Sequence, residues 1–160
     1  MSGTVVAADV TVNAETITVT GSVNASGNIT LNAVAQTGTL GTPDTLPIAN
    51  VATAVNINGA TLSGTTVTLN ASANLVSNVS NVNPPFPTVP TVPLASLFAN
   101  VSAEVALTGN AVVNASGFFT AHAESNVTAT VTANAVTGAL GEIAIAAPII
   151  NSTARSPPVG

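Results

Sequence analysis

The sequence predicts an all-β protein and, within that class, a parallel β-solenoid. Three observations support this prediction: short runs alternate β-branched and polar residues, a strand–corner–strand unit recurs, and the helix-favouring residues Glu, Lys and Arg are scarce. The alternative architecture is a β-sandwich, whose strands would alternate in the same way. Sandwich cores usually contain large aromatic side chains, and this chain has four Phe and no Trp or Tyr.

Period-two alternation marks the expected strands, because successive side chains of a strand point to opposite faces of a sheet. It occurs in residues 10–13, 16–20, 28–32, 55–58, 66–70, 127–132 and 143–145. The one segment compatible with a helix is 93–100, where Leu94, Leu97 and Phe98 have suitable spacing. It is too short to establish a helix by itself.

The strands belong to a repeated unit. Each unit has a strand ending in glycine, a small connector, a Ser-Gly pair and a second strand. The first glycines are Gly21, Gly59 and Gly109, and the pairs are 26–27, 63–64 and 116–117. Such a unit is one coil of a solenoid, in which each strand pairs with its counterparts in the coils on either side. Asparagines at the strand ends are expected at corners or in ladders between coils.

The repeat spacing grows, from 38 residues between Gly21 and Gly59 to 50 between Gly59 and Gly109. Two turn-rich stretches, 38–48 and 83–93, account for much of this growth and are expected to be loops. The second contains five prolines, which cannot donate to a strand ladder. The sequence therefore predicts one solenoid domain over 1–155 and a linker-like tail over 156–160.

Composition excludes several classes of partner. Charged residues make up 4% of the chain, against about 25% in an ordinary soluble protein. Arg155 is the only Lys or Arg, so the chain cannot neutralise the phosphates of a nucleic acid. The longest apolar stretch, 143–150, is shorter than the roughly 18 to 20 residues of a membrane-spanning helix. We expect neither a nucleic-acid partner nor a membrane span.

Candidate catalytic and metal-binding residues are few. His122 and Glu124 would share one strand face, and we interpret them as a solvated polar pair. No second His or Cys is present to complete a zinc site, and the six carboxylates are scattered singly. A carbohydrate-active solenoid remains an alternative, because its carboxylates come from distant positions, but the aromatic platforms of such enzymes are missing. We expect no catalysis, no cofactor and no metal.

Threonine strings are the main candidate for a binding face. Stacked in register, they would form an array of hydroxyl and methyl groups similar to that of ice-binding solenoids, although Thr also suits any solvent-facing strand. The candidate residues are Thr16, Thr18, Thr20, Thr66, Thr68, Thr128, Thr130 and Thr132.

The run of residues 59–73, GATLSGTTVTLNASA, resembles repetitive stretches of giant bacterial exoproteins such as filamentous-haemagglutinin-like adhesins. The resemblance implies a β-helix that serves as a stalk, spacer or adhesive surface. We therefore expect an extracellular or cell-surface structural protein, a subunit or segment of a fibre or adhesin. It would either self-associate head to tail or continue covalently into further repeats, because few charges protect the strand edges of its end coils.

Overall fold

A computed structural model describes residues 1–37, 48–80, 94–132 and 145–157, and every described strand pairing in it is parallel. The described part contains ten strands and no helix, and therefore no membrane-spanning helix. The strands are β1 (Thr4–Ala7), β2 (Val10–Ala14), β3 (Thr16–Val19), β4 (Ser22–Ala25), β5 (Asn28–Thr37), β6 (Ile48–Asn58), β7 (Thr61–Ser80), β8 (Leu94–Thr108), β9 (Val112–Thr132) and β10 (Ile145–Arg155).

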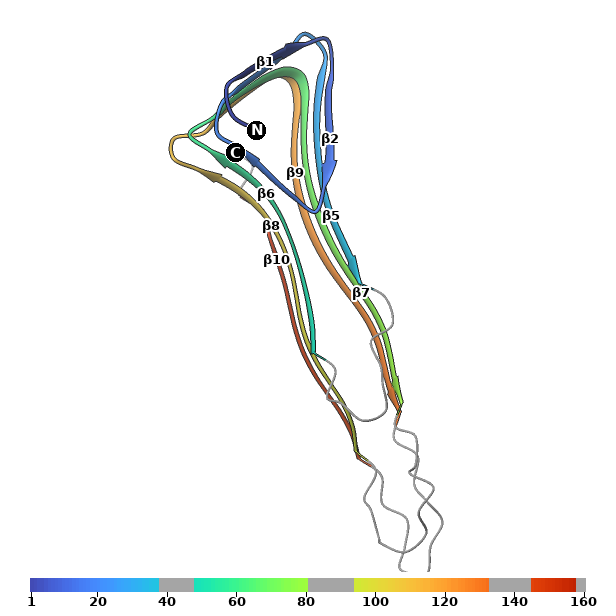
Figure 1. The fold of residues 1–160 in the computed structure, drawn as a ribbon. Coiled ribbons are helices and arrows are strands. Elements are labelled where there is room, and N and C mark those ends of the chain that lie inside the picture. Colours follow the sequence, from blue (N-terminus) through green and yellow to red (C-terminus); the bar gives the residue numbers. More distant parts are fainter. Residues whose placement is uncertain (38–47, 81–93, 133–144, 158–160) are drawn as a thin grey trace, which may run out of the picture.

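The strands wind into four stacked coils with three faces, so the predicted parallel β-solenoid is confirmed and the sandwich alternative is not. Face 1 contains β1, β4 and the first residues of β7 and β9. Face 2 contains β2, β5 and the longer remainders of β7 and β9. Face 3 contains β3, β6, β8 and β10. Figure 1 shows the three faces as a triangle, from which faces 2 and 3 continue as two long facing arms.

The predicted repeat units are the coils. Asn28 of β5 is in register with Thr66 of β7, which is in register with Phe118 of β9. Asn28 and Phe118 directly follow the predicted Ser-Gly pairs 26–27 and 116–117, whereas Thr65 separates the pair 63–64 from Thr66, where the register with β9 shifts. Two glycine corners also stack directly, because the Gly59 N–H donates to the Thr108 carbonyl (2.9 Å) just before Gly109. A Cβ at Gly21 would collide with the backbone of Gly3, which shows how closely successive corners approach.

The first coil was missing from the predicted repeats. Its glycine corner is at Gly3, but its second corner carries Asp9 in place of the glycine found at Gly27. The Asp9 carboxylate accepts a hydrogen bond from the Asn28 N–H (2.7 Å) in the coil above. The Asp9 carboxylate therefore stabilises this corner. Because the corner has no Ser-Gly pair, the repeat pattern did not reveal the first coil.

The repeat spacing increases along the chain partly because the strands themselves become longer. Residues 34–37 and 48–53 of the second coil extend beyond the reach of β2 and β3. Residues 76–80 and 94–97 of the third coil extend beyond β5 and β6 in turn. The prediction that turns account for much of the growth is thus incomplete. The predicted loops lie outside the described residues, except Ile48, which begins β6. The tail is described only to Pro157.

The core follows from the alternation of inward and outward side chains. Large residues such as Ile29, Leu31, Val55 and Ile57, which are in register with strands of the first coil, are fully buried. Small residues fill many inward positions where the two arms face each other, including Ala35, Ala49, Ala73, Ala99 and Ala103. The helix-compatible segment belongs to β8, where Ala95, Leu97 and Ala99 alternate inward. Small inward side chains let the two arms pack closely, so the long arms enclose a layer that is apolar except at a few positions such as Thr53 and Ser77.

Candidate functional site

The eight candidate threonines do not form one array. Thr16 and Thr18 lie on β3 in face 3, and Thr20 follows that strand. The other five lie on β7 or β9 in face 2. Only Thr68 has threonines as register partners on both sides. It belongs to a single column, one residue per coil, formed by Thr11, Thr30, Thr68 and Thr120.

The remaining candidates have mixed neighbours. Thr66 lies between Asn28 and Phe118, and Thr128 pairs with Val76. Thr130 and Thr132 pair with Asn78 and Ser80. A regular surface of threonines would need several adjacent threonine columns, and face 2 presents one.

Asparagine columns stack beside the threonine column, as the sequence predicted. The Asn32 side-chain amide donates to the Asn13 side-chain oxygen (3.0 Å) in the first coil. On face 3 the Asn100 amide donates to Asn50 (3.1 Å) in the same way. These bonds join coils on the outside of the solenoid, so the polar columns support the stack rather than form a binding pocket.

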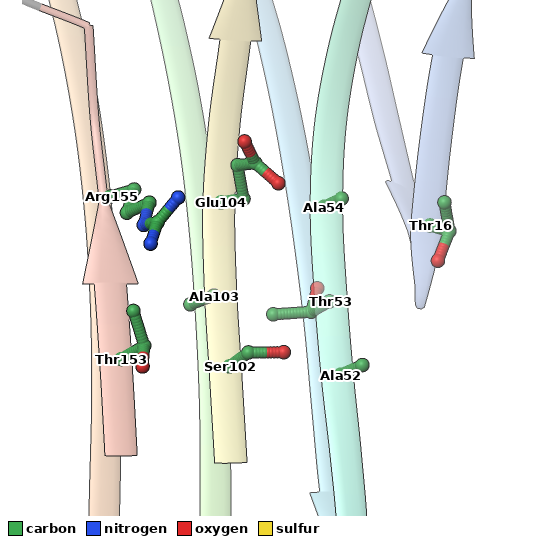
Figure 2. Close-up of a pocket in the computed structure, with 9 residues that line it drawn as sticks. All are labelled: Thr16, Ala52, Thr53, Ala54, Ser102, Ala103, Glu104, Thr153 and Arg155. Atoms are coloured by element: carbon green, nitrogen blue, oxygen red, sulfur yellow. The ribbon is translucent and has the colours of Figure 1, made fainter. Parts of the chain in front are cut away.

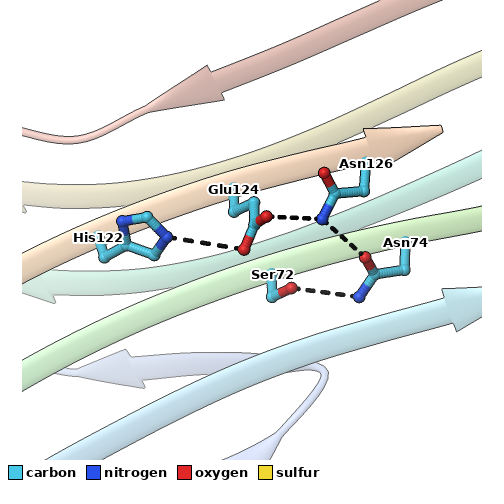
Figure 3. Close-up of polar contacts among 5 residues, drawn as sticks. All are labelled: Ser72, Asn74, His122, Glu124 and Asn126. Carbon is cyan, nitrogen blue, oxygen red and sulfur yellow. Dashed lines mark hydrogen bonds and ion pairs between the residues drawn. The ribbon is translucent and has the colours of Figure 1, made fainter.

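His122 continues the column of Asn13, Asn32 and Asn70 on the last coil. Its Nε2 lies 3.7 Å from a Glu124 carboxylate oxygen, and the two side chains are 58% and 49% exposed. Figure 3 shows that Glu124 also accepts a hydrogen bond from the Asn126 amide (2.7 Å), which donates to Asn74 (3.2 Å). This is an exposed polar network. No group of three metal-ligating side chains occurs anywhere in the described part of the chain.

A shallow hollow of about 380 Å³ lies on face 3, close to the start of β3 (Figure 2). Glu104 and Arg155 line it together with threonine, serine and alanine side chains. Glycoside hydrolysis needs two carboxyl groups about 5 to 9.5 Å apart, and Glu104 is the only carboxylate among the lining residues. The lining therefore lacks the pair of groups that this chemistry uses.

The feature with the strongest functional implication is the open end of the solenoid at β9 and β10. Strand β9 pairs with β7 along one edge, and its other edge has no partner among the described strands. Inward residues of β7, such as Leu69 and Ala71, are fully buried, whereas their β9 partners Ala121 and Ala123 are only partly buried. This last coil also exposes large apolar side chains, with Phe118 77% exposed.

The opposite end is better closed. The inward residues Val10, Ile17 and Val19 of the first coil are buried, although no coil lies beyond them in the described chain. The Met1 carbonyl accepts a hydrogen bond from the Thr20 N–H (2.9 Å), which places the first residue beside the end of β3. The sequence predicted exposed edges at both ends, and the structure shows a less covered core at the β9 end. The exposed edge of β9 could not be identified from the sequence, because its alternation is the same as that of an internal strand.

The two arms of the last coil meet across the apolar layer. The Ser125 hydroxyl of β9 lies 2.7 Å from the Ser152 hydroxyl of β10 and also donates to the Val101 carbonyl (3.2 Å). These contacts fix which residues of β9 and β10 lie opposite each other. Comparisons of the chain with family models, with curated proteins and with solved structures find no match.

Proposed function

We propose that the chain is a non-catalytic structural protein of the cell surface or extracellular space, a subunit or segment of a fibre or adhesin that self-associates at its open coil end. One observation carries the proposal. The 21-residue strand β9 has one edge unpaired in the described chain, beside an incompletely covered row of apolar side chains. An unpaired edge of this length is a template for pairing with another chain.

The composition supports this proposal. Native proteins usually protect exposed edges with charged side chains, prolines or a cap. Over its full length β9 carries one carboxylate, Glu124, and one histidine, His122, and no Lys, Arg or Pro. The resemblance of residues 59–73 to adhesin repeats supports the surface location and the role as stalk or spacer.

The test is a charge placed on the edge. The variant Val127→Lys puts an ammonium group at a partly buried inward position of β9, from which its flexible stem reaches water at the open end. We expect the wild-type chain to form larger species as concentration rises in sedimentation velocity and light scattering, and Val127→Lys to suppress them. Val76→Lys is the matched control, because Val76 on β7 points outward and is 57% exposed.

Circular dichroism of both variants checks that the β fold is retained. The proposal fails if the wild-type chain is monomeric at every concentration, or if both lysine variants associate as strongly as the wild type.

A further inference from the structure

We propose that the open ends of two copies meet face to face in a closed two-fold dimer, in which β9 of each copy pairs antiparallel with β10 of the other. This inference rests on the proposed self-association and specifies its geometry. Strands β9 and β10 run in opposite directions along the two arms of the last coil. A two-fold axis parallel to the strands and between the arms therefore places β9 of one copy on β10 of the other in the antiparallel sense.

The contact between Ser125 and Ser152 defines the register of this pairing. The two-fold axis exchanges the arms at equal height, so Ser125 of one copy falls opposite Ser152 of the second copy. Residues 122–132 of β9 then lie alongside residues 145–155 of β10, which is the whole length of β10, although Pro148 has no N–H to donate within this stretch. The described end of β9 at Thr132 meets the described beginning of β10 at Ile145.

The side chains brought together are of matching type. On the inward side, Val127 faces Ile150 of the second copy, and Ala123 faces Ala154 of the second copy. Ile150 is 42% exposed in the single chain, and Val127 is only partly buried. On the outward side, Asn126 lies beside Asn151 of the second copy, which repeats the Asn50–Asn100 hydrogen-bonded stack within the chain. The dimer thus covers the apolar row that the last coil leaves incomplete.

The charges are complementary as well. Arg155 falls opposite His122 of the second copy, and Glu124 of that copy is the next outward residue along the same strand. Side chains at such diagonal positions are about 7 to 8 Å apart at the backbone, within reach of a long arginine. Arg155, the only Lys or Arg in the chain, is already in register with Glu104 of its own chain, and in the dimer it would also come within reach of Glu124 of the second copy; symmetry gives this second contact twice.

A head-to-tail arrangement fits the open end less well. The first coil of a second copy would continue the register columns, so that its Ala14 would lie on Ala123 and its Thr16 on Arg155. Its β2 ends at Ala14 and its β3 begins at Thr16, so 124–132 and 145–154 would stay uncovered. The two-fold arrangement covers these same segments.

Cysteine pairs distinguish the two arrangements, since the chain has no native cysteine. Asn126 and Asn151 point to opposite outer sides of one molecule and meet only across the two-fold axis. The double variant Asn126→Cys/Asn151→Cys should therefore give a covalent dimer under mild oxidation that does not grow further. The control Thr11→Cys/Thr120→Cys, on the first and last coils, should stay uncrosslinked. A ladder of multimers from this control would overturn the two-fold dimer and retain self-association.

Charge exchange gives an independent readout. Arg155→Glu should weaken dimerisation about tenfold at low salt, because two contacts are lost and two repulsions appear. Glu124→Arg/Arg155→Glu should restore it. The two-fold geometry would be overturned if the chain associates but Asn126→Cys/Asn151→Cys gives no covalent dimer. It would also be overturned if Glu124→Arg/Arg155→Glu does not restore dimerisation. A monomeric wild-type chain in sedimentation would overturn the proposed function itself.

Discussion

Truncation of Leu69 tests whether stacking of the last coil stabilises the solenoid. Leu69 is fully buried on β7, in register with Leu31 below and Ala121 above. Leu69→Ala removes three carbons at about 0.8 kcal/mol each and leaves a cavity, so the free energy of unfolding should fall by about 3 to 4 kcal/mol. The cavity persists because strands in both neighbouring coils are held by ladders and cannot collapse into it.

Leu107 offers the matched control in the same coil. It is an inward residue of β8, but β10 reaches only Glu104 of that strand, so no described strand of the last coil covers Leu107, and it is partly exposed. Leu107→Ala should cost about 1 kcal/mol. Urea denaturation followed by far-UV circular dichroism measures both, since the chain has no Trp or Tyr for fluorescence. Equal losses for the two variants would refute the reasoning that the fourth coil seals the third.

Three further outcomes follow from particular residues. Ser77 is 3% exposed and its hydroxyl has no hydrogen-bond partner among the described residues, so Ser77→Ala should leave stability unchanged or raise it by up to about 1 kcal/mol in thermal unfolding; a clear loss would show that the hydroxyl has a partner. Gly109 has a φ of 61° and an added Cβ would meet the Asn58 side chain, so Gly109→Ala should lower stability by about 1 to 2 kcal/mol or more. Asn110→Gly, at the same φ of 61°, should lower it little or not at all, and similar losses at both sites would contradict the corner geometry. A chelator of divalent cations should leave the melting temperature unchanged, because the described residues include no cluster of metal ligands; a drop would overturn the expectation of a metal-free fold.

The sequence predicted the fold because its strongest signals are local. The alternation in 28–32 and 66–70 is the inward and outward alternation of β5 and β7, and the Ser-Gly pairs lie near the corners, although the pair 63–64 is in register with 114–115 and not with 116–117. Segment 93–100 was ambiguous because the inward positions hold Ala95, Leu97 and Ala99 while the large Phe98 points outward. Hydrophobicity alone does not distinguish a strand from a helix when small alanines occupy about half of the buried positions.

The arrangement of the candidate residues needed long-range information. Which threonines share a column depends on the length of every coil, and the coils differ in length. Thr16 therefore lies on face 3, while Thr66 lies on face 2. The open end was beyond sequence reasoning for a similar reason: partial burial of Ala121 reflects the absence of a covering strand in the described chain, not its own identity.

The increase in coil size along the chain also has a kinetic consequence. Partners in the first two coils, such as Asn13 and Asn32, are 19 residues apart, whereas Asn74 and Asn126 in the last two are 52 apart. Closing the longer loop costs about 1 kcal/mol more chain entropy. The two small coils therefore form the folding nucleus with the lowest loop-closure entropy cost. Once formed, they present a strand edge on which the next, longer strand can pair. Folding is expected to advance from the amino-terminal coils toward β9, in the order in which a ribosome delivers them.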